Sequence, residues 1–151
     1  LSPFNAFLIL TGIETLPLRM QKHCENAKAV AEFLAGHPAV AAVNYSGLAN
    51  DKYNQLARKY APKGAGAVFT FSLKGGYDSG VNLVSNLKLF SHLANVGDTR
   101  SLVIHPASTT HSQLDDAAKI KSGAAPDVVR LSIGIEDKED LIADLEQALG
   151  A

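Results

Sequence analysis

The chain has 151 residues, of which 46% are hydrophobic and 19% are charged. A chain of this length and composition can bury a hydrophobic core, which excludes a disordered or fibrous protein. The 14 Lys and Arg residues nearly balance the 15 Asp and Glu residues. No excess of positive charge therefore favours nucleic acid or an anionic membrane as a partner. No apolar stretch approaches the length that is needed to cross a bilayer.

The single cysteine, Cys24, excludes an internal disulfide framework and a zinc site built from cysteines alone. An unpaired cysteine is typical of a reducing compartment, so we expect a cytoplasmic protein. The chain begins at Leu1 and has its only methionine at Met20. We therefore expect it to be part of a longer protein.

The first 36 residues predict one long helix. Ser2 can cap the first free backbone amides, and Pro3 occupies a position where no N–H is needed. Gly36 and Pro38 end the helical pattern. Such a helix would be about 50 Å long at 1.5 Å per residue, which exceeds the size of a domain of this length.

Pro17 interrupts this helix, because its ring clashes with the carbonyl group four residues earlier. We expect a kink near Ile13. A long, kinked helix at the start of a chain is typical of a connector. We therefore interpret residues 1–36 as a linker helix from a domain outside this sequence, and residues 37–151 as the domain that follows it.

Short strands and helices alternate in the rest of the chain. The clearest strand is 67–73, in which Phe69 and Phe71 share one face. Asp137 is expected to cap a last helix that has Leu141 and Leu145 on one side. Further strands are predicted at 40–45, 93–96, 102–105 and 128–135, a short polar helix or loop at 51–60, and helices from Asp78 through Phe90 and at 113–121. This order favours an α/β two-layer domain, a mixed, mostly antiparallel sheet with helices on one side.

Arg130 lies in the middle of the predicted strand 128–135, on the face that later carries Ser132 and Gly134. A guanidinium group at such a position needs an anion, because a buried unpaired charge is very costly. Its planar fork binds a carboxylate or phosphate through two parallel hydrogen bonds. A structural salt bridge to an acidic side chain is the alternative, and these residues alone leave it open.

Two other segments carry groups that can hold an anion. Thr109 and Thr110 follow a predicted strand, where their hydroxyls can orient an arginine or bind an oxyanion, although ordinary turn chemistry explains them as well. The turn at 95–98 combines the Asn95 amide with free backbone N–H groups. His105 and His111 lack metal-ligand spacing, so we expect no metal.

Three segments resemble the Cys/Met-metabolism family of pyridoxal-phosphate (PLP) enzymes. SPFNAF at 2–7 with GIETLPLRM at 12–20 resembles the family's linker helix. SLVIHPASTTHSQL at 101–114 resembles the segment after its substrate loop, and VRLSIGIED at 129–137 is similar to its closing strand. With Asn-Val-Gly-Asp before it, HPASTTHSQL is most similar to the O-acetylhomoserine sulfhydrylase branch, because cystathionine synthases and lyases usually read Ser-Leu-Gly-Gly there.

The resemblance implies the C-terminal domain of a fold-type-I PLP-dependent transferase. Family members bind the α-carboxylate of an amino-acid substrate through an arginine, and Arg130 matches that position. Thr110 matches a threonine near this arginine. Asn95 lies where cystathionine enzymes carry a serine, and this departure leaves open whether Asn95 acts through its side chain or its backbone.

The implied reaction replaces the acetate of O-acetylhomoserine by sulfide and gives homocysteine, a step of methionine biosynthesis. None of the lysines lies in the family's Ser-x-Thr-Lys motif. We therefore expect PLP to be bound by an N-terminal domain outside this sequence, and we expect neither a catalytic nor a cofactor-binding residue in this chain, which would be inactive alone. The family also implies a homo-tetramer. The alternatives are a cystathionine γ-synthase or methionine γ-lyase type relative, and a non-catalytic α/β binding or oligomerisation module.

Overall fold

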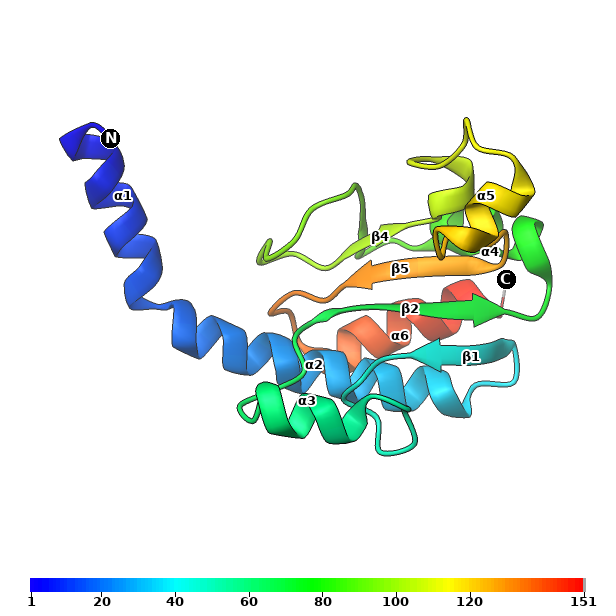
Figure 1. The fold of residues 1–151 in the computed structure, drawn as a ribbon, viewed down its shortest axis with the longest axis horizontal. Helices are drawn as coiled ribbons and strands as arrows, with labels where there is room; N and C mark the ends of the chain where they lie inside the picture. The colour runs from blue at the N-terminus through cyan, green and yellow to red at the C-terminus, as the bar shows by residue number, and fades with distance from the viewer. Residues whose placement is uncertain (151) are drawn as a thin grey trace.

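A five-stranded sheet in the order β1-β2-β5-β4-β3 lies at the centre of the computed structural model, which describes residues 1–150 (Figure 1). The β1–β2, β2–β5 and β5–β4 pairs are antiparallel, and the β3–β4 pair is parallel. The predicted mixed, mostly antiparallel sheet is therefore confirmed. The strands are β1 (Val40–Asn44), β2 (Val68–Leu73), β3 (Ser91–His92), β4 (Leu102–Ile104) and β5 (Val128–Ser132).

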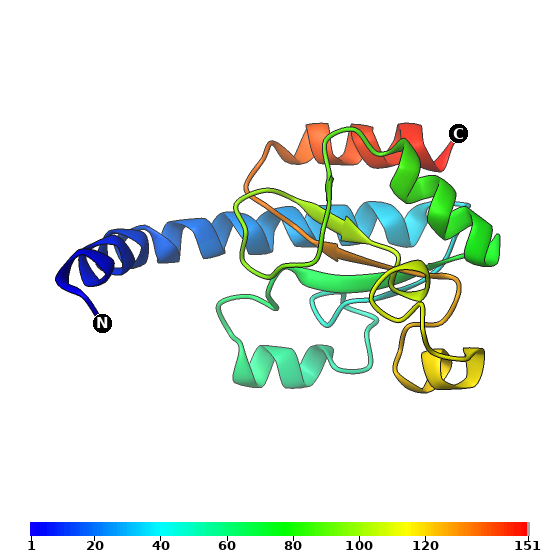
Figure 2. The same ribbon diagram turned by 90° about the horizontal axis from the view of Figure 1, so that it is seen from above.

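Three long helices cover one face of this sheet. Figures 1 and 2 show α2 and α6 behind the strands, with α4 beside them, whereas the short helices α3 and α5 lie on the other side near its margins. The expected helical layer on one side of the sheet is thus formed by the long helices. The helices are α1 (Pro3–Glu14), α2 (Leu16–Gly36), α3 (Asn54–Tyr60), α4 (Gly76–Asn86), α5 (Asp116–Lys121) and α6 (Lys138–Leu149), and Pro106–Ser108 forms a 3₁₀ turn, η1.

The hydrophobic core lies between the sheet and this helical layer. Strand β2 alternates as predicted, with Phe69 and Phe71 buried and Val68 exposed. Strand β5 alternates in the same way as far as Leu131, and Ser132, which follows, is also buried. Apolar side chains of α2 and α6 meet these strands, and burial of each Val or Leu side chain among them stabilises the fold by about 1.5–3 kcal/mol. The fully buried members include Ala27, Val30, Ala31, Leu34, Val129, Leu131, Leu141 and Leu145.

The predicted kink in the N-terminal helix is confirmed, and it lies at Thr15, where α1 ends and α2 begins. The break falls after Ile13 because Pro17 sits in the first turn of α2, where its missing N–H leaves no hydrogen bond unmade. Helix α1 projects from the body, and none of its residues is buried (Figure 1). Its exposed apolar side chains include Phe4, Phe7, Leu8, Ile9, Leu10 and Ile13. Such a surface normally requires a covering partner.

One predicted strand and one predicted helix cap are wrong. No strand forms at 93–96, because Asn95 and Asp98 accept hydrogen bonds from nearby backbone N–H groups, which favours a turn over a ladder. Asp78 does not cap a helix: α4 begins at Gly76, and Asp78 lies within its first turn.

Several other elements are shorter than predicted, and three of them have an identifiable boundary. Helix α4 ends at Asn86 and not at Phe90. Helix α5 begins at Asp116, because Asp115 caps it by accepting a hydrogen bond from Ala118 N–H. Strand β5 ends at Ser132, since the carbonyl groups that follow bond to side chains of α2.

The early end of α4 has a specific cause in the buried side chain of Asp144, on α6. Its carboxylate accepts hydrogen bonds from the backbone N–H groups of Lys88, Leu89 and Phe90, at 2.8 to 3.3 Å. These three donors follow α4 directly. The carboxylate thus fixes the turn after α4 against α6 and satisfies N–H groups that have left the helix.

We expect Asp144→Ala to lower the free energy of unfolding by about 2–4 kcal/mol, because it leaves several backbone donors unpaired. The matched control is Asp140→Ala, which removes an exposed carboxylate from the same helix. That change is expected to cost less than about 1 kcal/mol. Urea denaturation measures both values, and an equal loss in the two variants would contradict the assigned role of Asp144.

Tyr45, after β1, has a buried ring whose hydroxyl donates a hydrogen bond to the Gly66 carbonyl at 2.9 Å. The loop passes so close to this ring that a Cβ at Gly47 would lie 2.3 Å from the ring atom Cε1. Burial disfavours the phenolate, and the Cys24 thiol adds to this effect, so the pKa of Tyr45 is raised to about 12.

This raised pKa predicts a loss of stability at high pH. The unfolded chain releases the Tyr45 proton near its ordinary pKa of about 10, whereas the folded chain holds it to about 12. The unfolding free energy should therefore fall by about 2 kcal/mol more in the wild type than in Tyr45→Phe between pH 9.5 and 11.5. Tyr60→Phe, which changes an exposed tyrosine, should behave like the wild type. If the unfolding free energies of the wild type and Tyr45→Phe fell by the same amount over this pH range, the raised pKa of Tyr45 would be wrong.

Candidate functional site

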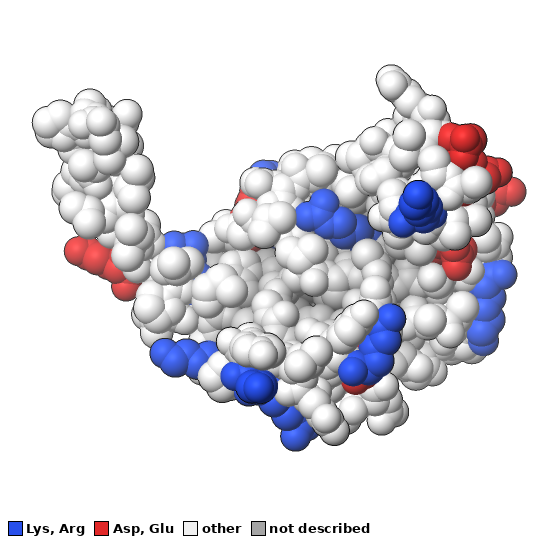
Figure 3. Space-filling model, in the orientation of Figure 1, with Lys and Arg blue, Asp and Glu red and all other residues white. Residues whose placement is uncertain are grey.

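The face of the sheet that points away from α2 and α6 carries the candidate site. Val129 and Leu131 of β5 face the core, so Arg130 and Ser132 lie on the opposite face. Arg130 is half-buried, and its register neighbours are Thr70 of β2 and Ile104 of β4. Figure 3 shows this side of the molecule as hollowed and formed largely by uncharged side chains.

The Arg130 guanidinium has no carboxylate partner among residues 1–150. Its Nη2 donates one long hydrogen bond, 3.4 Å, to the backbone carbonyl of Asn95. None of the ion pairs in the described part of the chain includes Arg130. The structural salt bridge that the sequence left open is therefore not found here. Most of the guanidinium's hydrogen-bonding capacity is left for an external anion.

Asn95 lies in the irregular segment 93–101, between β3 and β4. Its backbone oxygen faces Arg130, while its side-chain Oδ1 accepts a hydrogen bond from Val96 N–H at 2.8 Å. In the same turn, hydrogen bonds from the backbone and side chain of Arg100 hold the pKa of the Asp98 carboxyl below its usual value. The contact between Asn95 and Arg130 is thus made by the backbone.

Thr110 lies on a neighbouring loop. It follows η1, which packs against β5, and its exposed hydroxyl lies 2.8 Å from His111 Nδ1. Within residues 1–150 no hydrogen bond joins Thr110 to Arg130. The structure therefore brings Arg130 and Asn95 together, and it leaves Thr110 on the loop after η1 without a hydrogen bond to either of them.

His105 is a buried structural residue. Its Nε2 donates to the Pro126 carbonyl at 2.7 Å, and its Nδ1 lies 2.9 Å from the Ser108 hydroxyl. A Cβ at Gly80 would lie 2.6 Å from this ring, so only glycine allows α4 to approach it. In the part of the chain that the structure describes, no three His, Cys, Asp or Glu side chains gather as metal ligands.

A buried polar network beside β5 was missed by the sequence reasoning. It joins His23 and Asn26 of α2 to the residues after β5, and Ser101 to Glu136. The available signal was local: His23 and Asn26 lie on the same helical face as Ala27 and Val30, where apolar residues are expected. Polar side chains on a buried face must find hydrogen-bond partners.

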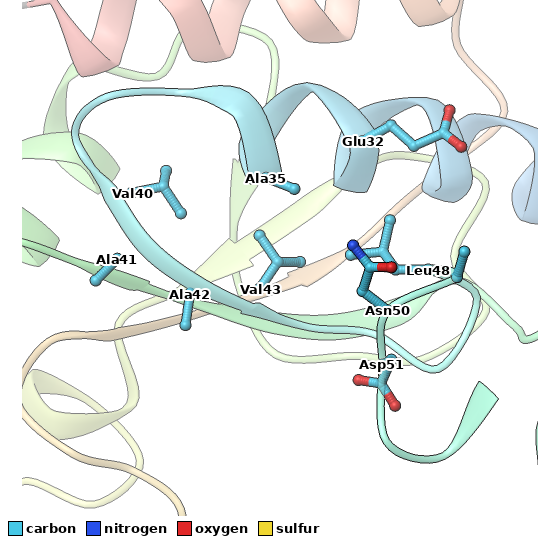
Figure 4. Close-up of a pocket in the computed structure, with 10 residues that line it drawn as sticks. Glu32, Ala35, Val40, Ala41, Ala42, Val43, Leu48, Asn50 and Asp51 are labelled. Carbon is cyan, nitrogen blue, oxygen red and sulfur yellow. The ribbon is translucent and has the colours of Figure 1, made fainter.

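A pocket of about 400 Å³ lies away from Arg130, between the end of α2, β1 and the loop that follows β1. Ala35, Val43 and Leu48 line it, with the carboxylates of Glu32 and Asp51 on different sides (Figure 4). Neither a guanidinium nor a nucleophile faces it, so it is a weaker candidate than the Arg130 face. None of the helices within residues 1–150 has both the length and the hydrophobicity that crossing a membrane requires.

Comparison with known proteins gives consistent matches. The chain is 52% identical over 150 residues to an O-acetyl-L-homoserine sulfhydrylase of Leptospira meyeri, covering 99% of this chain and 34% of the relative. It is 52% identical over 149 residues to O-acetyl-L-homoserine sulfhydrylase 1 of Thermus thermophilus, covering 99% of this chain and 35% of that protein. An L-methionine gamma-lyase of Treponema denticola is 46% identical, with 99% of this chain and 37% of the relative covered. The chain spans about a third of the length of these relatives.

A solved structure also superimposes on the whole chain. It is a Campylobacter jejuni protein described as an O-acetylhomoserine (thiol)-lyase, with a pyridoxyl-lysine monophosphate. The TM-score is 0.91 at 45% sequence identity, and the match covers 100% of this chain and 36% of that one. Residues 1–150 match the family described as Cys/Met metabolism PLP-dependent enzyme. The predicted fold and the resemblance are thereby confirmed, and the chain belongs to the Cys/Met metabolism family of PLP-dependent enzymes.

Proposed function

We propose that this chain is the substrate-orienting C-terminal part of an O-acetylhomoserine sulfhydrylase, which replaces the acetate of O-acetylhomoserine by sulfide and gives homocysteine. The observation that carries the proposal is the Arg130 guanidinium on an open face, without an acidic partner among residues 1–150. The names of the relatives at 52% identity support the choice of substrate.

Arg130 is proposed to bind the α-carboxylate of the substrate through two parallel, charge-assisted hydrogen bonds. Asn95 contributes its backbone oxygen, which accepts a hydrogen bond from the guanidinium and so restrains its orientation. Thr110, exposed on the loop after η1, is proposed to complete the site with its hydroxyl. Fixing the carboxylate in this way places Cα in a defined position, which is an orientation effect on the rate.

We propose that PLP is bound by a part of the longer protein outside this sequence. The absence of a Ser-x-Thr-Lys motif in this chain and the pyridoxyl-lysine of the Campylobacter jejuni relative support this assignment. The cofactor supplies the electron sink for proton removal at Cα and loss of the γ-substituent. This chain then supplies neither a catalytic nor a cofactor-binding residue and is inactive by itself.

In this proposal, residues 1–36 form the linker helix and residues 37–151 the substrate-binding domain, with the buried side of α2 packed into that domain. The exposed apolar side chains of α1 support an N-terminal PLP-binding domain of the same protein as their cover. We propose a homo-tetramer for the full-length enzyme. The unpaired Cys24 supports a cytoplasmic location.

A methionine γ-lyase type enzyme is the second candidate, because such relatives are 45% and 46% identical over 99% of the chain. A cystathionine γ-synthase type enzyme remains a further alternative of the same class. The non-catalytic module is no longer favoured, since the relatives compared above are named as enzymes.

The full-length protein distinguishes these candidates by its second substrate. We expect O-acetylhomoserine and sulfide to give homocysteine faster than O-acetylhomoserine and cysteine give cystathionine. Product analysis by mass spectrometry after equal incubation times measures the ratio. Preferential formation of cystathionine would replace the sulfhydrylase assignment by a synthase, and release of methanethiol from methionine would replace it by a lyase.

Arg130→Ala in the full-length enzyme should raise the KM for O-acetylhomoserine by at least about 30-fold, because loss of a charge-assisted bidentate contact costs about 2–5 kcal/mol. Arg130→Lys should also be impaired, since an ammonium group cannot form the fork. The control is Arg58→Ala, which removes an exposed arginine of α3 and should leave KM unchanged. An unaltered KM in Arg130→Ala would remove this residue from the site.

A further inference from the structure

Glu136 lies four residues after β5, and its carboxylate binds Ser101 twice. Oε1 accepts a hydrogen bond from Ser101 N–H at 2.6 Å, and Oε2 accepts one from the Ser101 hydroxyl at 2.9 Å. The Ser101 Oγ in turn accepts a hydrogen bond from Gly134 N–H at 2.8 Å, and Ser101 is fully buried. These bonds tie the stretch after β5 to the residue that precedes β4. We refer to Glu136, Ser101, Gly134 and Asn26 as the Glu136 network.

The backbones joined by this network are in direct contact. A Cβ at Gly134 would lie 2.4 Å from the carbonyl oxygen of Thr99 and 2.5 Å from the carbonyl carbon of Arg100. One residue later, Ile135 N–H donates to the same Thr99 oxygen at 2.9 Å. The network therefore fixes residues 99–101, the end of segment 93–101. The backbones of residues 99–101 and 133–136 have no space to shift toward each other.

Helix α2 holds the same stretch from another side. The buried Asn26 amide donates to the carbonyl groups of Gly134 and Glu136, at 3.1 and 2.7 Å. His23, also buried, donates from Nδ1 to the Ile133 carbonyl at 2.6 Å. Residues 133–136 are thus held between α2 and residues 99–101.

Arg130 and Asn95, which contact each other in the candidate site, each lie a few residues before a part of this network. Arg130 is followed within a few residues by 133–136, and Asn95 is followed by 99–101. Residues 92–97 are all exposed, so this part of the segment has little packing of its own to hold Asn95 in place. Within residues 1–150 Glu136 forms no ion pair, and the bonds its carboxylate makes are those to Ser101.

We propose that the Glu136 network positions Arg130 and Asn95 for the substrate carboxylate, with Glu136 and Ser101 as positioning residues. This inference rests on the proposed function in one respect, namely that the ligand of Arg130 is an α-amino acid. Without the network, segment 93–101 loosens, the Asn95 oxygen leaves the guanidinium, and the fork loses its orientation.

The test uses full-length holoenzyme with two variants of the network. Glu136→Gln keeps the side-chain shape but replaces one of the two carboxylate acceptors by an NH2 donor, so that the N–H and the hydroxyl of Ser101 can no longer both donate to it. Ser101→Ala removes the hydroxyl while keeping the backbone bond. We expect each variant to raise the KM for O-acetylhomoserine by about tenfold and to change kcat less than about threefold. The matched controls Glu146→Gln and Ser85→Ala alter exposed residues and should change KM less than about twofold.

A double-mutant cycle separates positioning from general destabilisation. If Glu136 acts through Arg130, then Glu136→Gln should change KM less than about twofold in an Arg130→Lys background. Persistence of the full tenfold effect in that background would overturn the proposal. Amide hydrogen exchange of Ser101 and Ile135 should also become faster in Glu136→Gln. Faster exchange together with an unchanged KM would also overturn the proposal.

The proposed function is tested separately, by the substrate preference of the wild-type enzyme. If the wild-type enzyme prefers another amino acid to O-acetylhomoserine, the proposed function fails, and the cycle is run with that amino acid, because the α-carboxylate is common to the class. Coupling between Glu136 and Arg130 in that cycle supports the network, and additivity rejects it.

Discussion

The position of one guanidinium group constrains the chemistry of the whole open face. Arg130 lies in β5, which has β2 on one edge and β4 on the other, so the strand's backbone is occupied by ladder hydrogen bonds. Its neighbours Val129 and Leu131 face the core. The charge can therefore point only to the open face, where a single long bond to the Asn95 carbonyl is its protein contact within residues 1–150. A cation held in this way makes an anion, such as a carboxylate or a phosphate, the preferred ligand of that surface.

Helix α2 connects this face to the rest of the molecule by two kinds of interaction. Ala27 and Val30 pack in the apolar core, whereas His23 and Asn26 bond to the backbone after β5. The same helix is joined to α1 through the break at Thr15. A partner that covers the apolar α1 would thus contact a helix that is joined directly to α2, the helix that supports the residues after the strand of Arg130. The proposed division of labour, with cofactor chemistry elsewhere and substrate orientation here, fits this arrangement.

Much of the fold was predictable from local patterns. The alternation of Phe69 and Phe71 marked β2, Asp137 marked the start of α6, and Pro17 marked the break in the N-terminal helix. Each of these signals depends on residues within one or two turns of chain, and the geometry they specify is the same in any context. Arg130 was found in the same way, because a lone charge in an apolar strand is visible without knowing its neighbours.

The sequence by itself thus determined most element types, the core faces and the position of a lone arginine in an apolar strand. Only the tertiary structure decided that α4 stops at Asn86, which depends on the Asp144 carboxylate 56 residues beyond Lys88. Only the structure paired Ser101 with Glu136, 35 residues apart, and turned the Asn95 backbone toward Arg130. Hydrogen bonds between residues so distant leave no periodic trace in a sequence, because their partners are chosen by how the layers pack and not by the chain around them.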